Sequence, residues 1–265
     1  MKATLISAEF ATVNQLFAYK ELGLPLKPFP GYTDDQWGIK AHNRPWITDK
    51  GGFRHGERIA EVGGAYSLLP EYLAEKFGTE SWIIDDFGGY SKESGLWQRW
   101  GDPDAWIAQH PRVRYIKKPM GFFESEIPAD YFDCVFSVST LEHIPSELWP
   151  AVFKDMLRIT RPGGRQLHAI DLPLYPLRKS LQWGLWSLLP GSSFLKAHPL
   201  RRWRRALRQA GVKTGCSWPG MAHMFDRSLL VESSDVVFRF YPPINRKKDY
   251  PAGGFSLLLE IVREA

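Results

Sequence analysis

The stretch from 58 to 86 contains a pair of adjacent glycines, Gly63 and Gly64, and carboxylates at the ends of two apolar runs, Glu61, Asp85 and Asp86. Arg58 to Val62 is a short apolar run that predicts a strand, and Gly63-Gly64 follow it directly. Glycine lets the backbone approach a ligand where a Cβ would clash. A second strand, Trp82 to Ile84, ends on Asp85-Asp86, where a carboxylate can accept hydrogen bonds from ribose hydroxyls. This stretch therefore predicts a nucleotide-type ligand at the carboxyl ends of parallel strands.

The elements that must position these residues alternate between strands and helices. Leu68 to Phe77 has apolar residues at helical spacing, and Asp102-Pro103 is typical of a helix start. Val113 to Ile116 predicts a third strand, and the long apolar run at 131–138 predicts a central parallel strand. A helix at 146–160 is expected next, closed by Arg161-Pro162-Gly163-Gly164. A fifth strand, Gln166 to Ile170, ends at Asp171.

Three ordered motifs resemble the class I S-adenosylmethionine-dependent methyltransferases. They are E-V-G-G-A at 61–65, F-D-x-V-x-S followed by L-E-H-I-P between 132 and 145, and P-G-G at 162–164. The resemblance implies a Rossmann-like α/β fold with a mostly parallel seven-stranded sheet, and S-adenosyl-L-methionine as the cofactor. The chain departs from the family pattern at Ala65, where glycine is common. It also has Lys118 to Gly121 where the family often has an acid that binds adenine.

The resemblance also assigns roles to residues. Glu61 and the glycine turn would face the methionine part of the cofactor, Asp85 or Asp86 the ribose, and Ser139 to Leu141 the sulfonium. The full set of expected cofactor-binding residues is Glu61, Gly63, Gly64, Ala65, Asp85, Asp86, Met120, Gly121, Ser139, Thr140 and Leu141. His143 is the first candidate for a general base, although E-H-I-P in this family commonly packs the entry to a helix. His42, His55, His168 and Asp171 are further candidates.

The division of the chain follows from where the strands begin. Residues 1–57 are rich in turn residues and aromatics and are expected to form a cap, with a short amphipathic helix around 10–17. Residues 58–265 would form the methyltransferase domain, with an insertion at 172–200, a helix at 203–210 and strands at 236–241 and 256–262. We expect an aromatic acceptor pocket with walls from the cap and the insertion. Its residues would be Trp37, Trp46, Tyr175, Trp183 and Trp186.

Composition narrows the class of partner. The 265 residues carry a net charge of +5, and the only cysteines, Cys134 and Cys216, have no metal-ligand or redox spacing. No window has the length and apolar continuity of a membrane span, and the N-terminus does not have the pattern of a signal peptide. We therefore expect a cytoplasmic enzyme with a small-molecule acceptor, such as a sugar or a secondary metabolite with a hydroxyl or amine. No nucleic-acid motif and no metal site are apparent.

Two other functions remain open. The departures at Ala65 and at 118–121 fit a catalytically inactive, cofactor-binding partner protein. Alternatively, the apolar segment at 183–194 and the arginines at 201–208 fit a methyltransferase that acts on lipids at an anionic membrane surface.

Overall fold

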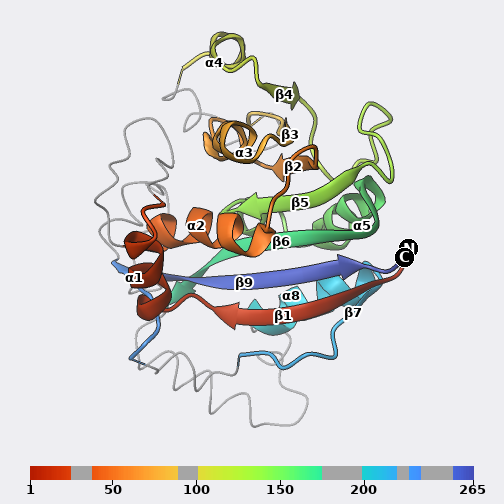
Figure 1. Ribbon diagram of the computed structural model, residues 1–265. Coiled ribbons are helices and arrows are strands. Elements are labelled where there is room, and N and C mark those ends of the chain that lie inside the picture. Colours follow the sequence, from red (N-terminus) through yellow and green to blue (C-terminus); the bar gives the residue numbers. More distant parts are fainter. Residues whose placement is uncertain (25–37, 89–100, 175–198, 220–226, 234–252) are drawn as a thin grey trace.

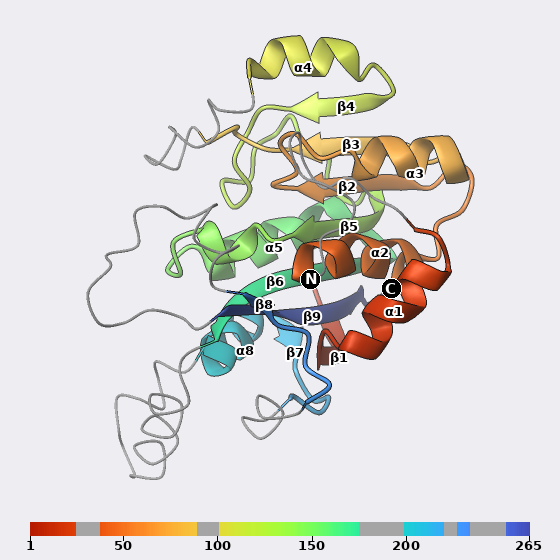
Figure 2. The same cartoon turned by 90° about the vertical axis from the view of Figure 1, so that its left-hand side faces the viewer.

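A computed structural model describes residues 1–24, 38–88, 101–174, 199–219, 227–233 and 253–265. These residues form one twisted sheet with helices on both faces (Figures 1 and 2). The strand order is β4-β3-β2-β5-β6-β9-β1-β7, with β8 paired to β9. The mostly parallel α/β sheet predicted from the sequence is confirmed, although the described part of the chain has nine strands rather than seven.

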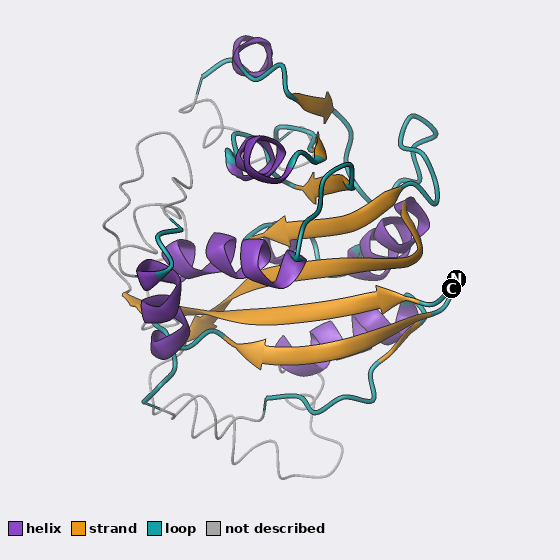
Figure 3. Cartoon of the chain, viewed as in Figure 1, coloured by secondary structure: helices purple, strands orange, loops and turns teal. Residues whose placement is uncertain are grey.

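The parallel half of the sheet carries the predicted motifs. Its strands are β2 (Arg58–Val62), β3 (Glu80–Ile84), β4 (Val113–Ile116), β5 (Phe132–Val138) and β6 (Thr160–Leu174). Every residue of β5 is buried, as expected for a central strand. The other half consists of β9 (Gly253–Arg263), which runs antiparallel to β6, together with β1 (Ala3–Phe10), β7 (Val212–Lys213) and β8 (Glu232–Ser233). The colouring of Figure 3 separates these strands from the helices that cover them.

Two helix layers enclose the sheet. One face is covered by α1 (Val13–Glu21), α2 (Ile39–Gly51) and α3 (Leu69–Phe77), which share an apolar cluster with β5 and β6. The opposite face is covered by α5 (Trp149–Ile159) and α8 (Pro199–Gln209). A shorter helix, α4 (Pro103–Gln109), packs its Trp106 ring edge-on to Tyr66. Asp102 caps α4 by accepting from the N–H of Asp104 at 3.2 Å, as its sequence predicts.

The N-terminal segment differs from the expected cap. Ala3–Phe10 lies inside the sheet, where it pairs antiparallel with β9 and parallel with β7. Ala3 and Leu5 are buried while Ile6 is half exposed, so side chains of this strand alternate between a buried face and an exposed face. This alternation was hidden in the sequence because a register shift between Leu5 and Ser7 interrupts it. The predicted amphipathic helix is present as α1, with Thr12 as its N-cap.

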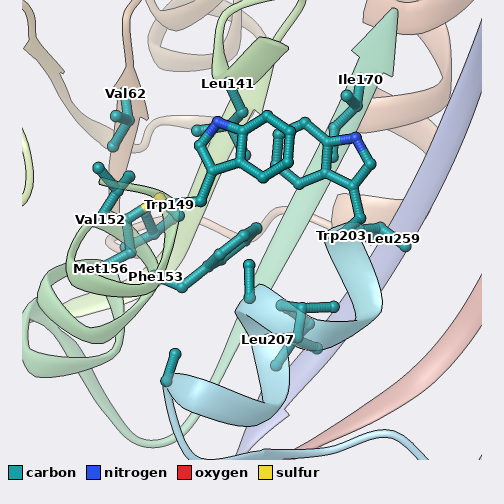
Figure 4. Close-up of a cluster of buried hydrophobic side chains, with 14 of the residues drawn as sticks. Val62, Leu141, Trp149, Val152, Phe153, Met156, Ile170, Trp203, Leu207 and Leu259 are labelled. Atoms are coloured by element: carbon teal, nitrogen blue, oxygen red, sulfur yellow. The ribbon is translucent and has the colours of Figure 1, made fainter. Parts of the chain in front are cut away.

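The core between the sheet and α5 holds the strand ends in place. The indole rings of Trp149 and Trp203 stack at 3.6 Å and join α5 to α8 (Figure 4). Val62 at the end of β2, Leu141 just after β5 and Ile170 within β6 point into the same cluster. Because neighbouring residues of a strand face opposite ways, burial of Ile170 turns Asp171 to the other side. The apolar core thus fixes where the polar residues beside it stand.

Candidate functional site

The turn after β2 is held against the end of β5. Gly63 has a φ of +73°, and a Cβ there would lie 1.9 Å from Thr140 Cγ2. The Thr140 hydroxyl donates to the carbonyl oxygen of Gly63 at 3.0 Å. Gly63 is therefore required by both its backbone conformation and this contact. Two residues that the sequence places in one cofactor site, Gly63 and Thr140, are brought together.

Glu61 lies beneath this turn, and its side chain is 1% exposed. A Cβ on Gly64 would lie 3.1 Å from the Glu61 carboxyl carbon. Burial raises the pKa of Glu61 to about 7, although the Arg44 guanidinium and a hydrogen bond from Ser67 act in the opposite direction. Glu61 Oε2 is buried and has no hydrogen-bond partner in the described part of the chain. A buried acceptor of this kind calls for a donor from a ligand.

Asp85 stabilises the turn from the next strand. Its Oδ2 accepts from the N–H of Ala65 at 3.0 Å, and its Oδ1 accepts from the N–H of Phe87. Ala65 has a φ of 38°, so it adopts the left-handed conformation that glycine usually supplies. Burial raises the pKa of Asp85 to about 7. Asp86 is half-buried and accepts from the N–H of Gly88 at 3.1 Å, so the more accessible of the two carboxylates is Asp86.

Met120 and Gly121 lie against α5. Met120 is buried in the core, and the N–H of Gly121 donates to Asp155 Oδ2 at 2.9 Å. Gly121 has a φ of +100°, and a Cβ there would lie 2.9 Å from Val152. These contacts explain both residues without a ligand. A role for them in binding adenine stays a prediction.

A polar cluster that was largely not predicted surrounds Asp171, which lies near the carboxyl end of β6; the strand continues to Leu174 rather than ending at Asp171. Asp171 accepts from Lys40 Nζ, from Asn43 Nδ2 at 3.1 Å and from the Ser256 hydroxyl at 3.3 Å. Asn43 also donates to the Ser139 hydroxyl at 3.4 Å. Glu142 and Glu232 complete what we call the Asp171 cluster: Lys40, Asn43, Glu142, Asp171, Glu232 and Ser256.

The sequence offered one signal for this cluster. Glu142 stands in L-E-H-I-P beside His143, which was the first candidate base because it follows the predicted central strand. The His143 side chain is 42% exposed, with Nε2 at 3.8 Å from Glu142 Oε1. Lys40 and Asn43 come from a segment that precedes β6 by more than a hundred residues, so no local pattern could join them to Asp171.

The other candidate histidines stand elsewhere. His168 is fully buried within β6, with Nδ1 at 2.9 Å from the Ser137 hydroxyl, and burial lowers its pKa to about 3. His42 is buried against Gln15 in α1, and burial lowers its pKa to about 4. His55 precedes β2, at the opposite end of the strand from the glycine turn. A general base among these three is not supported by their positions.

The expected aromatic pocket is only partly testable. Trp46 is fully buried in the cluster between α2 and the sheet, so it is a core residue rather than a pocket wall. It was mistaken for a wall because H-N-R-P-W resembles a turn, whereas these residues lie within α2 and Pro45 is inside the helix. Trp37, Tyr175, Trp183 and Trp186 lie outside the described residues.

The fold and the glycine turn are typical of α/β proteins that bind a nucleotide-type ligand at the carboxyl ends of parallel strands. Residues 48–214 match the family model described as a methyltransferase domain. The chain belongs to this family, which confirms the S-adenosylmethionine-dependent methyltransferase domain predicted from the sequence.

Known proteins similar to this chain are distant from it. A ubiquinone biosynthesis O-methyltransferase of Aeromonas salmonicida is 28% identical over 124 residues, which are 45% of either chain, so this chain matches about half the length of that relative. A putative sarcosine dimethylglycine methyltransferase from Galdieria sulphuraria has a TM-score of 0.47 at 12% identity, over 94% of this chain and 97% of that one. Phosphoethanolamine N-methyltransferase 2 of Haemonchus contortus, solved with S-adenosyl-L-methionine, has a TM-score of 0.45 at 14% identity, over 94% and 57%.

Two kinds of feature were not found among the described residues. No helix in these ranges is long and apolar enough to cross a membrane. No group of three or more histidine, cysteine or acidic side chains there is arranged to hold a metal ion.

Proposed function

We propose that this protein transfers the methyl group of S-adenosyl-L-methionine to a hydroxyl or amine of a small molecule. The observation that carries the proposal is the Glu61 carboxylate, which is buried beneath the Gly63-Gly64 turn with one oxygen unmatched by the described residues. S-adenosyl-L-methionine has an ammonium group on its methionine part, and an ammonium both donates hydrogen bonds and neutralises a carboxylate. The residues therefore fit this cofactor.

Each part of the site would contribute differently. Glu61 would bind the ammonium group, while Asp86, half-buried after β3, would bind the ribose hydroxyls. Asp85 would act mainly by holding Ala65 and Phe87, since both of its oxygens already accept backbone N–H groups. When bound, the cofactor supplies a methyl group that is already activated by the positive sulfur. The protein then has to exclude water and hold the acceptor in line.

Calorimetry with S-adenosyl-L-methionine tests the proposal. We expect the wild type to bind it and Glu61→Gln to bind it about 10- to 100-fold more weakly, because a charge-assisted hydrogen bond is lost. Glu75→Gln is the matched control, since Glu75 is an exposed carboxylate paired with Arg112 on the surface. Absence of binding to the wild type at millimolar cofactor would refute the proposed function. Equal binding by Glu61→Gln would refute the role of Glu61 alone.

The inactive-partner alternative is weakened by the geometry at Ala65. Alanine replaces the glycine that is common there, yet Ala65 keeps the left-handed backbone and its N–H bond to Asp85. The backbone conformation of the turn is therefore kept despite the alanine.

The lipid alternative is weakened by the contacts of the arginines in α8. Arg204 donates to the carbonyl oxygen of Thr214 at 3.0 Å, and Arg208 donates to its hydroxyl at 2.8 Å. Arg202 lies 5.1 Å from the centre of the Trp149 ring. Arg204 is half-buried, whereas Arg202 and Arg208 stay exposed despite these contacts, so only part of the basic surface of α8 is taken up within the protein.

A further inference from the structure

The Asp171 cluster contains more acidic groups than it can match. Asp171 itself is satisfied, because Lys40, Asn43 and Ser256 donate to it from α2 and β9. In the described part of the chain, the Lys40 ammonium donates its hydrogen bond to Asp171. Its positive charge also acts on Glu142 and Glu232. Glu232 has no cation of its own among the described residues, and Glu142 has the His143 ring, whose Nε2 lies 3.8 Å from Oε1 and whose pKa is lowered to about 4 by burial.

Both of these glutamates have buried oxygens without side-chain partners. Both oxygens of Glu142 are buried and neither makes a side-chain hydrogen bond among the residues described, although the backbone N–H groups of Glu142 itself and of Asp171 lie close enough to favour its ionised form. Glu232 is 5% exposed; it accepts N–H groups at the start of α2, but its Oε2 has no described partner. Asn43 is fully buried, and the neighbour of its carbonyl oxygen in the described part of the chain is the His42 ring, at a geometry too poor for a full hydrogen bond. Buried polar atoms left in this state are costly to the protein unless a ligand satisfies them.

Electrostatics agree with this geometry. Burial, followed by the nearby Asp171, raises the pKa of Glu142 well above its ordinary range, and Lys40 and two backbone N–H groups only partly oppose them. Burial also raises the pKa of Glu232, with Lys40 and Asp171 again as the neighbouring charges. A cation bound beside either glutamate would lower its pKa again.

The cluster is continuous with the cofactor site. Asn43 donates to the Ser139 hydroxyl, and the next residue, Thr140, donates to the carbonyl oxygen of Gly63. Glu142 follows two residues later in the turn at Leu141–His143. A group bound between Glu142 and Asp171 would therefore stand at the same strand ends as the glycine turn.

We propose that the Asp171 cluster is the acceptor site and that the acceptor is a small molecule with a basic amine, held by Glu142 and Glu232. This inference rests on the proposed function and names its class of substrate. Lys40, Asn43 and Asp171 position the two glutamates. Glu142 receives the proton that the ammonium must lose: the N–H bond breaks, its electron pair stays on nitrogen, and an O–H bond forms on the carboxylate. Asp171 is less suited to this step because it already accepts three hydrogen bonds.

Matched amines and alcohols test the class of acceptor. The probes are benzylamine against benzyl alcohol and glucosamine against glucose. Each is titrated into the wild type saturated with S-adenosyl-L-homocysteine, and methylated nitrogen is sought by mass spectrometry with S-adenosyl-L-methionine. We expect an amine to bind at least 10-fold more tightly than its alcohol. Alcohols that bind as well as the amines would overturn the inference, as would failure of both amines to bind at millimolar concentration.

Variants test the residues. Glu142→Gln and Glu232→Gln should each weaken amine binding at least 10-fold and leave cofactor binding unchanged, while Glu147→Gln, an exposed neighbour, should change neither. Glu142→Gln and Glu232→Gln should each also raise the Tm by roughly 2–4 °C, because each removes a buried carboxylate that lacks a cation. A lower Tm would indicate a structural role and overturn the inference. If the wild type does not bind S-adenosyl-L-methionine at all, the proposed function is refuted instead.

Discussion

Glu61 is a buried carboxyl group, and its raised pKa makes the stability of the free protein depend on pH. The native state keeps the proton up to a pH of about 7, whereas the unfolded chain loses it near the ordinary value of 4.5. Glu61 therefore contributes its full stabilisation below pH 4.5, and this is lost as the pH rises to about 7. The same sign applies to Asp85, whose pKa is also raised to about 7.

This predicts a difference between the wild type and Glu61→Gln. Between pH 4.5 and 7 the unfolding free energy of the wild type should fall relative to the variant by an amount on the order of 3 kcal/mol at most. Urea unfolding of the free proteins at several pH values measures it. The curves should converge when S-adenosyl-L-methionine is added near pH 7, since its ammonium group favours the ionised Glu61. Parallel curves without cofactor would show that Glu61 titrates normally.

At the scale of elements, the two glycines of the turn have different tasks. Gly63 combines a φ of +73° with a Cβ position 1.9 Å from Thr140, whereas Gly64 faces the Glu61 side chain at 3.1 Å. Gly63→Ala should lower the unfolding free energy by about 2–4 kcal/mol, from backbone strain plus overpacking. Gly64→Ala should mainly weaken cofactor binding by displacing Glu61. Denaturant unfolding and calorimetry on both variants separate these effects.

A glycine with no side chain nearby measures how much of the loss in unfolding free energy comes from backbone strain alone. Gly52 has a φ of +51°, and a Cβ there would meet no described atom within 4 Å. Gly52→Ala should therefore cost only about 1–2 kcal/mol. If Gly63→Ala costs no more than this control, the contact with Thr140 is not rigid.

The elements also show which parts of the fold are predictable from sequence. β2 and β4 have the predicted bounds because both are short apolar runs that end at turn residues. The helix expected at 146 begins at Trp149 instead, because Pro145 and Pro150 favour a start just before the second proline. α2 was not predicted, since its polar residues resemble a loop; in the structure Lys40 and Asn43 face Asp171 while Trp46 and Ile47 face the core. Such a helix is stabilised by partners distant in sequence, and local patterns do not contain them.

At the scale of the whole molecule, the first strand brings the N-terminal and C-terminal ends of the chain together. β1 lies between β9 and β7, and the N–H of Glu264 donates to the carbonyl oxygen of Lys2 at 3.0 Å, so the two termini meet at one end of the neighbouring strands β1 and β9. The same N-terminal region supplies α2, which carries Lys40 and Asn43 to the end of β6. The part expected to be a cap thus provides both a strand of the sheet and two residues of the proposed acceptor site.

Adjacent residues of β1 test whether this strand is integral to the fold. Leu5 is 1% exposed in the core against α8 and β9, while Ile6 is 51% exposed on the other side. Leu5→Asp should lower the unfolding free energy by roughly 3–5 kcal/mol or prevent folding, because it buries an unpaired charge and removes core contacts. Ile6→Asp, the matched control, should stay within about 0.5 kcal/mol of the wild type. A detachable cap would give a different result: both variants would unfold at the wild-type denaturant concentration, and only acceptor turnover would change. Unfolding followed by tryptophan fluorescence distinguishes the two, and an unchanged midpoint for Leu5→Asp would contradict the placement of β1 within the sheet.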